Sequence, residues 1–168
     1  MCIRDRLSST FFPIYSIGKV LIRYLPTFLL RRYYTAERLS NLVYCDLVPR
    51  GESAQLDLGQ VTSARVYLQL INLSPLPIEL DRGQFSLQCA GAKIDFVHVS
   101  PRIAMTPGMA AQLPLQATIH EGSSRAIRDH FDPLINVQMT GYLEFTCTTG
   151  KFTKSICFSE IRPHLINR

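Results

Sequence analysis

The stretch VYLQLINLSPLPIEL, residues 66–80, decides the fold class of this chain. Its first half alternates apolar with more polar side chains, which is the period of a half-buried β-strand. The alternation stops at Asn72, which favours a turn, and neither Pro75 nor Pro77 can donate a hydrogen bond to a strand ladder. It resumes from Ile78. We therefore expect one strand to end here and the chain to cross over before it pairs again.

The same two-residue period recurs through most of the chain after residue 41. The positions expected on the inward face of each run are Phe85, Leu87 and Cys89; Ile94, Phe96 and His98; Leu113, Leu115, Ala117 and Ile119; Val137, Met139, Gly141, Leu143, Phe145 and Cys147; and Phe152, Lys154, Ile156 and Phe158. Six or more short strands joined by turns predict a mainly β protein. We expect residues 41–168 to form an antiparallel β-sandwich of the immunoglobulin or fibronectin type.

Several connections have readable turn chemistry. Gly108, in Thr-Pro-Gly, is suited to a positive φ, and residues 148–151 should close a hairpin between the last two strands. The polar residues 50–55 are predicted to form a loop within the first hairpin.

One segment, residues 121–132, departs from the strand pattern and predicts a short helix. Ser123 or Ser124 could cap it, with Ile127 and Phe131 on one side, and it should close one end of the sandwich.

Positive charge is concentrated near the N-terminus. Residues 1–50 contain eight Arg or Lys and three acidic residues, whereas the rest of the chain contains ten of each sign. The neutral body offers no long-range field for nucleic acid, so we expect no nucleic-acid partner. The first six residues, MCIRDR, back-translate to ATGTGTATAAGAGACAG, which is similar to a sequencing-library transposase adapter. We interpret residues 1–6 as an artefact and leave them out of the fold prediction.

Residues 7–40 form a basic, apolar leader and a connector. Residues 11–30 are long enough to span a bilayer, but Lys19 and Arg23 interrupt them. On a helix, one face would carry Ile14, Ile17, Gly18, Leu21, Ile22, Leu25, Phe28 and Leu29, and the other Ser16, Lys19, Arg23 and Thr27. This pattern predicts an amphipathic helix at a membrane surface. The predicted membrane-contacting residues are Lys19, Leu21, Arg23, Leu25, Phe28, Arg31 and Arg32.

Two alternatives remain for the leader: a truncated transmembrane helix, or an amphipathic helix packed on its own protein. After it, Thr35 should cap a connecting helix with Ala36 and Leu39 facing inward.

Turn residues give the body a resemblance to a known family. The strand that ends in Asn72 and Pro75, the pattern Phe85, Leu87, Gly91 and Ile94, the pair Pro107 and Gly108, and the strand led by Gly141 resemble the late-embryogenesis-abundant type 2 (water stress and hypersensitive response) domain over residues 42–162. The chain departs from the family by separating Asn72 from Pro75. The resemblance implies a non-enzymatic, often membrane-tethered β-sandwich linked to desiccation or stress protection in plants, bacteria and archaea, with no catalytic residue to transfer.

The residues themselves carry no clear catalytic or metal-binding pattern. Cys45, Cys89, Cys147 and Cys157 form no C-x-x-C pair, and the last two lie too far apart along one hairpin to bridge. We expect Cys89 and Cys147 to be buried thiols. The four histidines are scattered. We therefore expect no cofactor, no metal site and no enzymatic activity.

One exposed row could bind a partner. Tyr67, Gln69 and Ile71 give an apolar character to the side of their strand that should face water, and the final hairpin presents an edge that another strand could extend. The leader could instead fold back over this row. Our leading hypothesis is a membrane-associated, stress-protective or interaction domain; the alternative is an immunoglobulin-like envelope adaptor for one protein partner.

Overall fold

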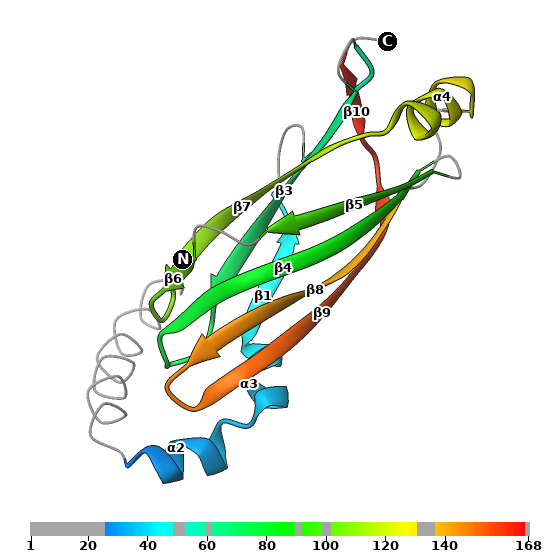
Figure 1. Ribbon diagram of the computed structural model, residues 1–168. Helices are drawn as coiled ribbons and strands as arrows, with labels where there is room; N and C mark the ends of the chain where they lie inside the picture. The colour runs from blue at the N-terminus through cyan, green and yellow to red at the C-terminus, as the bar shows by residue number, and fades with distance from the viewer. Residues whose placement is uncertain are drawn as a thin grey trace, which may run out of the picture.

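The computed structural model describes residues 26–48, 53–59, 62–89, 92–98, 102–130 and 137–166. In this part of the chain, two β-sheets pack face to face, and three short helices lie at their ends and side (Figure 1). The helices are α2 (Thr27–Tyr33), α3 (Ala36–Leu42) and α4 (Glu121–His130). The prediction of a mainly antiparallel β-sandwich is confirmed.

The first sheet is built around β3 (Ser63–Asn72), which pairs with β7 (Ala110–Thr118) on one side. On its other side lie β1 (Val43–Leu47) and β2 (Ala54–Asp57), both antiparallel to β3. They pair with successive parts of β3 and so form one interrupted strand. At the interruption, Tyr67 accepts a hydrogen bond from the Val48 amide and donates one to the Ser53 carbonyl, at 3.0 and 2.9 Å.

This arrangement corrects one prediction. Ala54 and Gln55, which were predicted to lie in a hairpin loop, begin β2. The strands β1 and β2 do not form a hairpin with each other, because both run in the same direction along β3. Alternation alone could not distinguish an interrupted strand from a hairpin. The short strand β10 (His164–Ile166) adds to β2 in parallel and completes this sheet.

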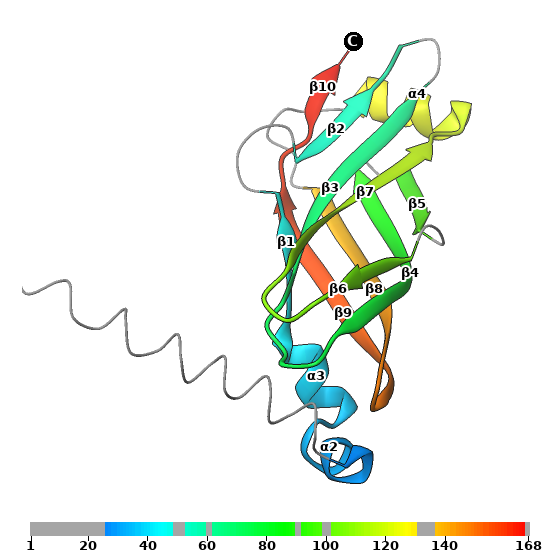
Figure 2. The ribbon, with the colours of Figure 1, turned by 90° about the vertical axis from the view of Figure 1, so that its left-hand side faces the viewer.

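The second sheet is built around β4 (Ile78–Cys89), with β8 (Val137–Cys147) along one side and β9 (Gly150–Ile161) beyond it. On the other side of β4, β5 (Ala92–His98) and β6 (Ile103–Met105) lie end to end. The chain passes between the sheets from β3 to β4, from β6 to β7, from β7 to β8 and from β9 to β10 (Figure 2). Each sheet contains one interrupted edge: β1 and β2 lie end to end along β3, and β5 and β6 lie end to end along β4.

The predicted crossover after residue 71 is confirmed, since β3 and β4 belong to different sheets. Asn72 is fully buried, and its side-chain amide donates to the carbonyls of Leu76 and Met105 at 2.9 and 3.0 Å. Its side-chain oxygen accepts from the amide and hydroxyl of Ser74, at 3.0 and 2.6 Å. All the hydrogen-bonding capacity of the Asn72 side chain is thus used to join the β3–β4 turn to the end of β6.

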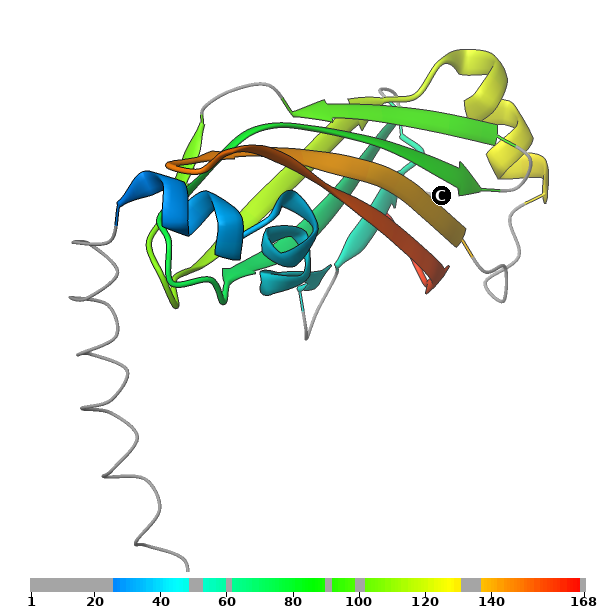
Figure 3. The ribbon, with the colours of Figure 1, turned by 90° about the horizontal axis from the view of Figure 1, so that it is seen from below.

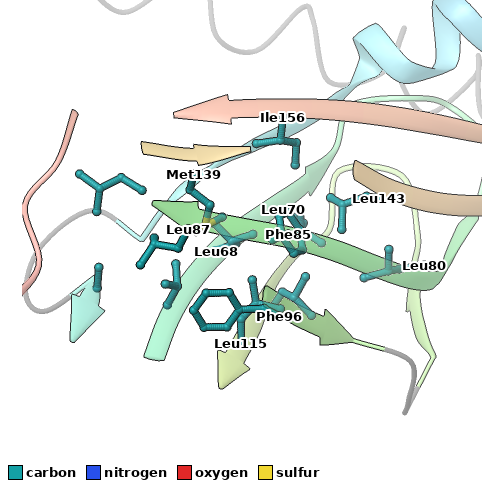
Figure 4. Packing of buried hydrophobic residues seen from close by; sticks show 14 of the residues in the cluster. Leu68, Leu70, Leu80, Phe85, Leu87, Phe96, Leu115, Met139, Leu143 and Ile156 are labelled. Carbon is teal, nitrogen blue, oxygen red and sulfur yellow. The ribbon is translucent and has the colours of Figure 1, made fainter. Parts of the chain in front are cut away.

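The core lies between the sheets, and Figure 4 shows how side chains from both sheets meet there. The predicted alternation is confirmed: the largest fully buried side chains include Phe85, Phe96 and Phe145. Gly141 lies opposite Phe85, and a Cβ atom there would come within 2.5 Å of the Phe85 ring. Gly141 is therefore required for close packing of that ring.

Both predicted tight turns are confirmed. Gly108 has φ of 78°, and Gly150, in the turn between β8 and β9, has φ of 138°. These values lie in regions that side chains disfavour, which explains glycine at both positions.

Helix α4 closes one end of the sandwich, with Ile127 fully buried. It begins before the predicted caps, because the Ser124 amide already donates to the His120 carbonyl at 2.9 Å. The prediction that Ser123 or Ser124 caps this helix is therefore wrong. The Ser124 hydroxyl instead lies 3.0 Å from the Thr62 hydroxyl, and both residues are buried. Phe131 lies outside the described residues.

Helix α3 lies against β9 and β1 at one side of the sandwich, as seen from below in Figure 3. Thr35 caps it as predicted, accepting from the Arg38 amide at 3.4 Å. Leu39 is buried, but Ala36 is exposed, contrary to the prediction. The helix has only seven residues, and Ala36 is at its first position, away from the contact with β9.

Candidate functional site

The predicted membrane-contacting residues fall into two groups. Lys19, Leu21, Arg23 and Leu25 lie outside the described residues, whereas Phe28, Arg31 and Arg32 lie on α2 and are exposed. Pro26 precedes α2 with a non-helical ψ of 139°. The predicted helical face over residues 14–29 therefore does not continue through Pro26, because a proline ring is incompatible with an unbroken helix interior.

Helix α2 is held to the body by Leu30, which is buried in the main core. Its other large side chains face outward: Phe28 is 69% exposed, Tyr33 64% and Leu29 42%. On a helix, Phe28 and Arg32 share the side opposite Leu30. The result is a short helix that exposes aromatic and aliphatic side chains beside two arginines.

Arg31 and Arg32 occupy the last turn of α2. Positive charge is favourable there, because carbonyl groups at a helix C-terminus carry partial negative charge. Among the residues that the structure describes, no acidic side chain forms a salt bridge with either arginine. Within the described part of the chain, the charge of both arginines is therefore available to an anionic surface.

The corner between α2 and α3 fixes the direction of α2. Arg38 donates to the Tyr33 carbonyl at 2.9 Å, and its guanidinium lies 5.2 Å from the centre of the Tyr33 ring. The Tyr33 and Tyr34 rings meet edge to face. Tyr34 packs against the core, and this burial raises its pKa. On the other side, the Lys154 ammonium donates to the Ser40 carbonyl at 2.9 Å, which joins α3 to β9.

None of the helices in the described part of the chain is long and apolar enough to cross a membrane.

The predicted row of Tyr67, Gln69 and Ile71 lies on the outer face of the first sheet. All three are half-buried, because neighbouring strands flank them. Tyr44 lies opposite Ile71, and the Tyr44 hydroxyl donates to Asp46 at 2.7 Å. That hydrogen bond raises the pKa of Tyr44. The structure thus brings the row together as predicted, and its role as a partner surface stays a prediction.

The outer face of the second sheet is polar. Arg82 and Glu144 form a salt bridge at 2.9 Å, and the Tyr142 hydroxyl donates to Gln84 at 2.9 Å. These contacts are exposed to solvent and contribute little to stability. They make this face of the sheet polar.

A hollow of about 600 Å³ lies beside α4, a feature that no sequence motif indicated. It is lined by Gly59, Thr62, Thr118, Ile119, Glu121, Ser124 and Arg128. Arg128 donates to the carbonyls of Leu58 and Gly59, and the two buried hydroxyls bond each other. The Arg128 guanidinium and the Thr62 and Ser124 hydroxyls, which line the hollow, therefore already form hydrogen bonds that close this end of the sandwich.

The described cysteines are all free thiols. Cys89 is buried as predicted and burial raises its pKa, whereas Cys147 is only half-buried, beside the Thr149 hydroxyl at the turn. Burial raises the pKa of Cys45 to about 12, although Lys154 acts in the opposite direction. Cys45 is therefore protonated and a poor nucleophile at neutral pH. Within the described ranges, no three His, Cys, Asp or Glu side chains are placed to hold a metal ion.

No family model and no curated protein sequence matches the chain. Among solved structures, a structural genomics target, SoR45, is similar with a TM-score of 0.52 at 15% identity, covering 76% of this chain and 95% of that one. An ApaA-type protein of Bordetella pertussis gives 0.43 at 12% identity, over 75% of this chain and 92% of that one.

A solution structure described as a late embryogenesis abundant protein gives a TM-score of 0.36 at 14% identity, over 90% of this chain and 88% of that one. The likeness to SoR45 supports the β-sandwich fold and nothing finer.

Proposed function

We propose that the protein is a non-enzymatic β-sandwich held at a membrane surface by its N-terminal region, with a stress-protective or interaction role of the late-embryogenesis-abundant type 2 kind. The observation that carries the proposal is the composition of α2. It exposes Phe28, Leu29 and Tyr33 beside Arg31 and Arg32, while Leu30 fixes it to the body.

Physical chemistry favours a bilayer interface as the environment of α2. Complete burial of a side chain such as Phe or Leu is worth about 1.5–3 kcal/mol. Each basic residue near an anionic membrane surface contributes roughly 1 kcal/mol. The basic leader, with Lys19 and Arg23, would add to both contributions.

The proposed mechanism is physical. The leader and α2 hold the domain at the membrane, and the polar outer face of the second sheet is available to partner proteins or stressed client proteins.

The test is salt-dependent co-sedimentation of the full chain with anionic and neutral vesicles. Lys19→Glu with Arg23→Glu should abolish binding, and Arg31→Glu with Arg32→Glu should weaken it more than tenfold, because reversing two interfacial charges removes several times the thermal energy. Arg65→Glu with Arg125→Glu changes the net charge equally, but on exposed positions of β3 and α4. This control should bind like the wild type. Unchanged binding of both leader and α2 variants would overturn the proposal.

The alternative is an immunoglobulin-like adaptor for one protein partner, favoured by the outward row Tyr67, Gln69 and Ile71. Stoichiometric binding of a single protein, lost in Tyr67→Ser, would support the adaptor. Protection of unrelated enzymes or vesicles during drying would support the first proposal.

A further inference from the structure

Exposed large apolar side chains are gathered at one end of the described molecule. They are Phe28, Leu29, Tyr33, Tyr44, Leu73 and Met109. We name this the α2 end; it also holds the β3–β4, β6–β7 and β8–β9 turns, as Figures 1 and 2 show from two directions. The α4 end, where α4 and β10 lie, contributes none of these six residues.

Two of the six, Leu73 and Met109, belong to turns rather than to α2. Leu73 is 53% exposed in the β3–β4 turn and Met109 is 42% exposed in the β6–β7 turn. Turn positions usually carry Gly, Pro, Asn, Asp or Ser, each of which has a local conformational reason to be there. Leu and Met have no such local reason, and about half of each side chain remains in contact with water. Their exposure therefore points to a contact outside the domain.

Backbone hydrogen bonds hold the two turns beside each other. The Asn72 amide donates to the Met109 carbonyl at 3.0 Å, and the Gly108 amide donates to the Asn72 carbonyl at 2.7 Å. The Leu73 amide donates to the Leu42 carbonyl at 2.8 Å, which links the same turn to α3. With the buried Asn72 side chain, these bonds fix Leu73 and Met109 as a rigid pair, which we call the turn-tip pair.

The surroundings of the turn-tip pair indicate its partner. Arg31 and Arg32 are exposed on α2, and Lys151 is exposed beside the β8–β9 turn. Exposed aliphatic side chains on rigid turns, with exposed basic residues at the same end of the domain, match the boundary between acyl chains and anionic headgroups. The leader, which the proposed function places on the membrane, enters the described chain at this same end.

We propose that the turn-tip pair inserts into the headgroup region of an anionic bilayer beside α2. The sandwich then stands on its α2 end, with α4 facing away from the membrane. This inference rests on the proposed membrane function and adds to it a second contact and an orientation.

The test compares full-chain variants in co-sedimentation with phosphatidylserine-containing vesicles. Leu73→Ser with Met109→Ser should bind about tenfold more weakly, since partial burial of two such side chains is worth roughly that factor. Tyr67→Ser removes apolar surface from the face of the first sheet and should change binding little. Thermal unfolding should show that each variant remains folded. Leu73→Phe keeps an apolar tip and should bind a few times more tightly, which keeps the test decisive if the Ser variants unfold.

The outcomes separate the two proposals. If the wild type does not pellet with anionic vesicles, the proposed membrane function fails. If the wild type pellets but the turn-tip variants pellet equally well, only the insertion of the turns is overturned. Weaker vesicle binding by Tyr67→Ser, with unchanged binding by the turn-tip variants, would also overturn the insertion of the turns. It would indicate that the sandwich lies on the membrane with the outer face of its first sheet.

Discussion

The α2 end and the α4 end of the sandwich are closed by similar means but present different surfaces. At the α2 end, the buried Asn72 side chain bonds the backbone of the β3–β4 turn and of the end of β6. At the α4 end, the buried Thr62 and Ser124 hydroxyls bond each other, and Arg128 bonds two carbonyls. Outside these contacts, the α2 end exposes Phe28, Leu73 and Met109, whereas the α4 end surrounds a hollow lined by both polar and apolar side chains.

The comparison shows that the contacts that close an end of the sandwich do not determine which side chains that end exposes. Buried hydrogen bonds are sufficient to close an end of the sandwich, because they leave no buried polar group without a partner. The exposed parts of the Leu73 and Met109 side chains do not contribute to closing the sandwich. Their gathering at one end therefore needs another physical reason, and contact with a lipid surface supplies one.

The largest effect on stability is expected at the α2 end. Asn72→Ala would leave the carbonyls of Leu76 and Met105 and the polar groups of Ser74 without their partner. We expect the free energy of unfolding to fall by about 3 kcal/mol, since each buried unpaired group costs roughly 1–3 kcal/mol. Urea denaturation measures this loss. Vesicle binding should weaken as well, because the turn-tip pair loses its support. A stability change within experimental error would contradict the role given to Asn72.

The matched change at the α4 end should cost less. Ser124→Ala removes one buried hydroxyl and leaves Thr62 without its side-chain partner, so we expect a loss of about 1 kcal/mol in the same denaturation experiment. Binding to anionic vesicles should be unchanged. Equal losses of lipid affinity in Ser124→Ala and Asn72→Ala would show that overall stability, and not the α2 end, controls binding.

A stabilising change is also available at the α4 end. Gly122 lies in α4, and a Cβ atom there would meet nothing within 4 Å. Gly122→Ala should therefore raise the free energy of unfolding by up to about 0.5 kcal/mol, which is less than the helix-interior difference because Gly122 is the second residue of α4. A thermal melt would detect it. Destabilisation would mean that the start of α4 is not helical.

The smallest effect at neutral pH concerns Cys45, on β1. Its pKa is raised from 9.0 to about 12 by burial, so folding favours the protonated thiol. The contribution to stability is complete below pH 9 and is lost as pH rises from 9 towards 12. Stability of the wild type should therefore decline over that interval, and the Cys45→Ala variant should decline less steeply. Cys157, which is exposed, should react with a thiol reagent in the native state before Cys45 does. Rapid labelling of Cys45 at neutral pH would contradict its burial.

The sequence predicted those parts of the fold that depend on local patterns of residues. Alternation identified the core of β3, β4 and β8. The residues of the β6–β7 turn predicted the positive φ of Gly108, and residues 148–151 predicted the turn between β8 and β9. Local signals could not reveal partners far along the chain. The bond from Asn72 to the Met105 carbonyl joins residues 33 positions apart, and the end-to-end pairing of β1 and β2 depends on β3.

The candidate site shows the same limit. Composition indicated Phe28, Arg31 and Arg32 as membrane-contacting residues because they follow an apolar, basic stretch. Leu73 and Met109 carried no such signal, since each is a single apolar residue within a turn. Only the pairing of the strands places both turns at the end where α2 lies.

The most direct test of the membrane-facing α2 end uses tryptophan fluorescence. The chain has no Trp, so Leu73→Trp at the α2 end and Arg125→Trp at the α4 end each introduce a single emitter. On addition of anionic vesicles, we predict a blue shift of Leu73→Trp emission, with quenching by brominated lipids, and no change for Arg125→Trp. A shift of Arg125→Trp alone, or no shift of either variant when both pellet with the vesicles, would contradict a sandwich that stands on its α2 end.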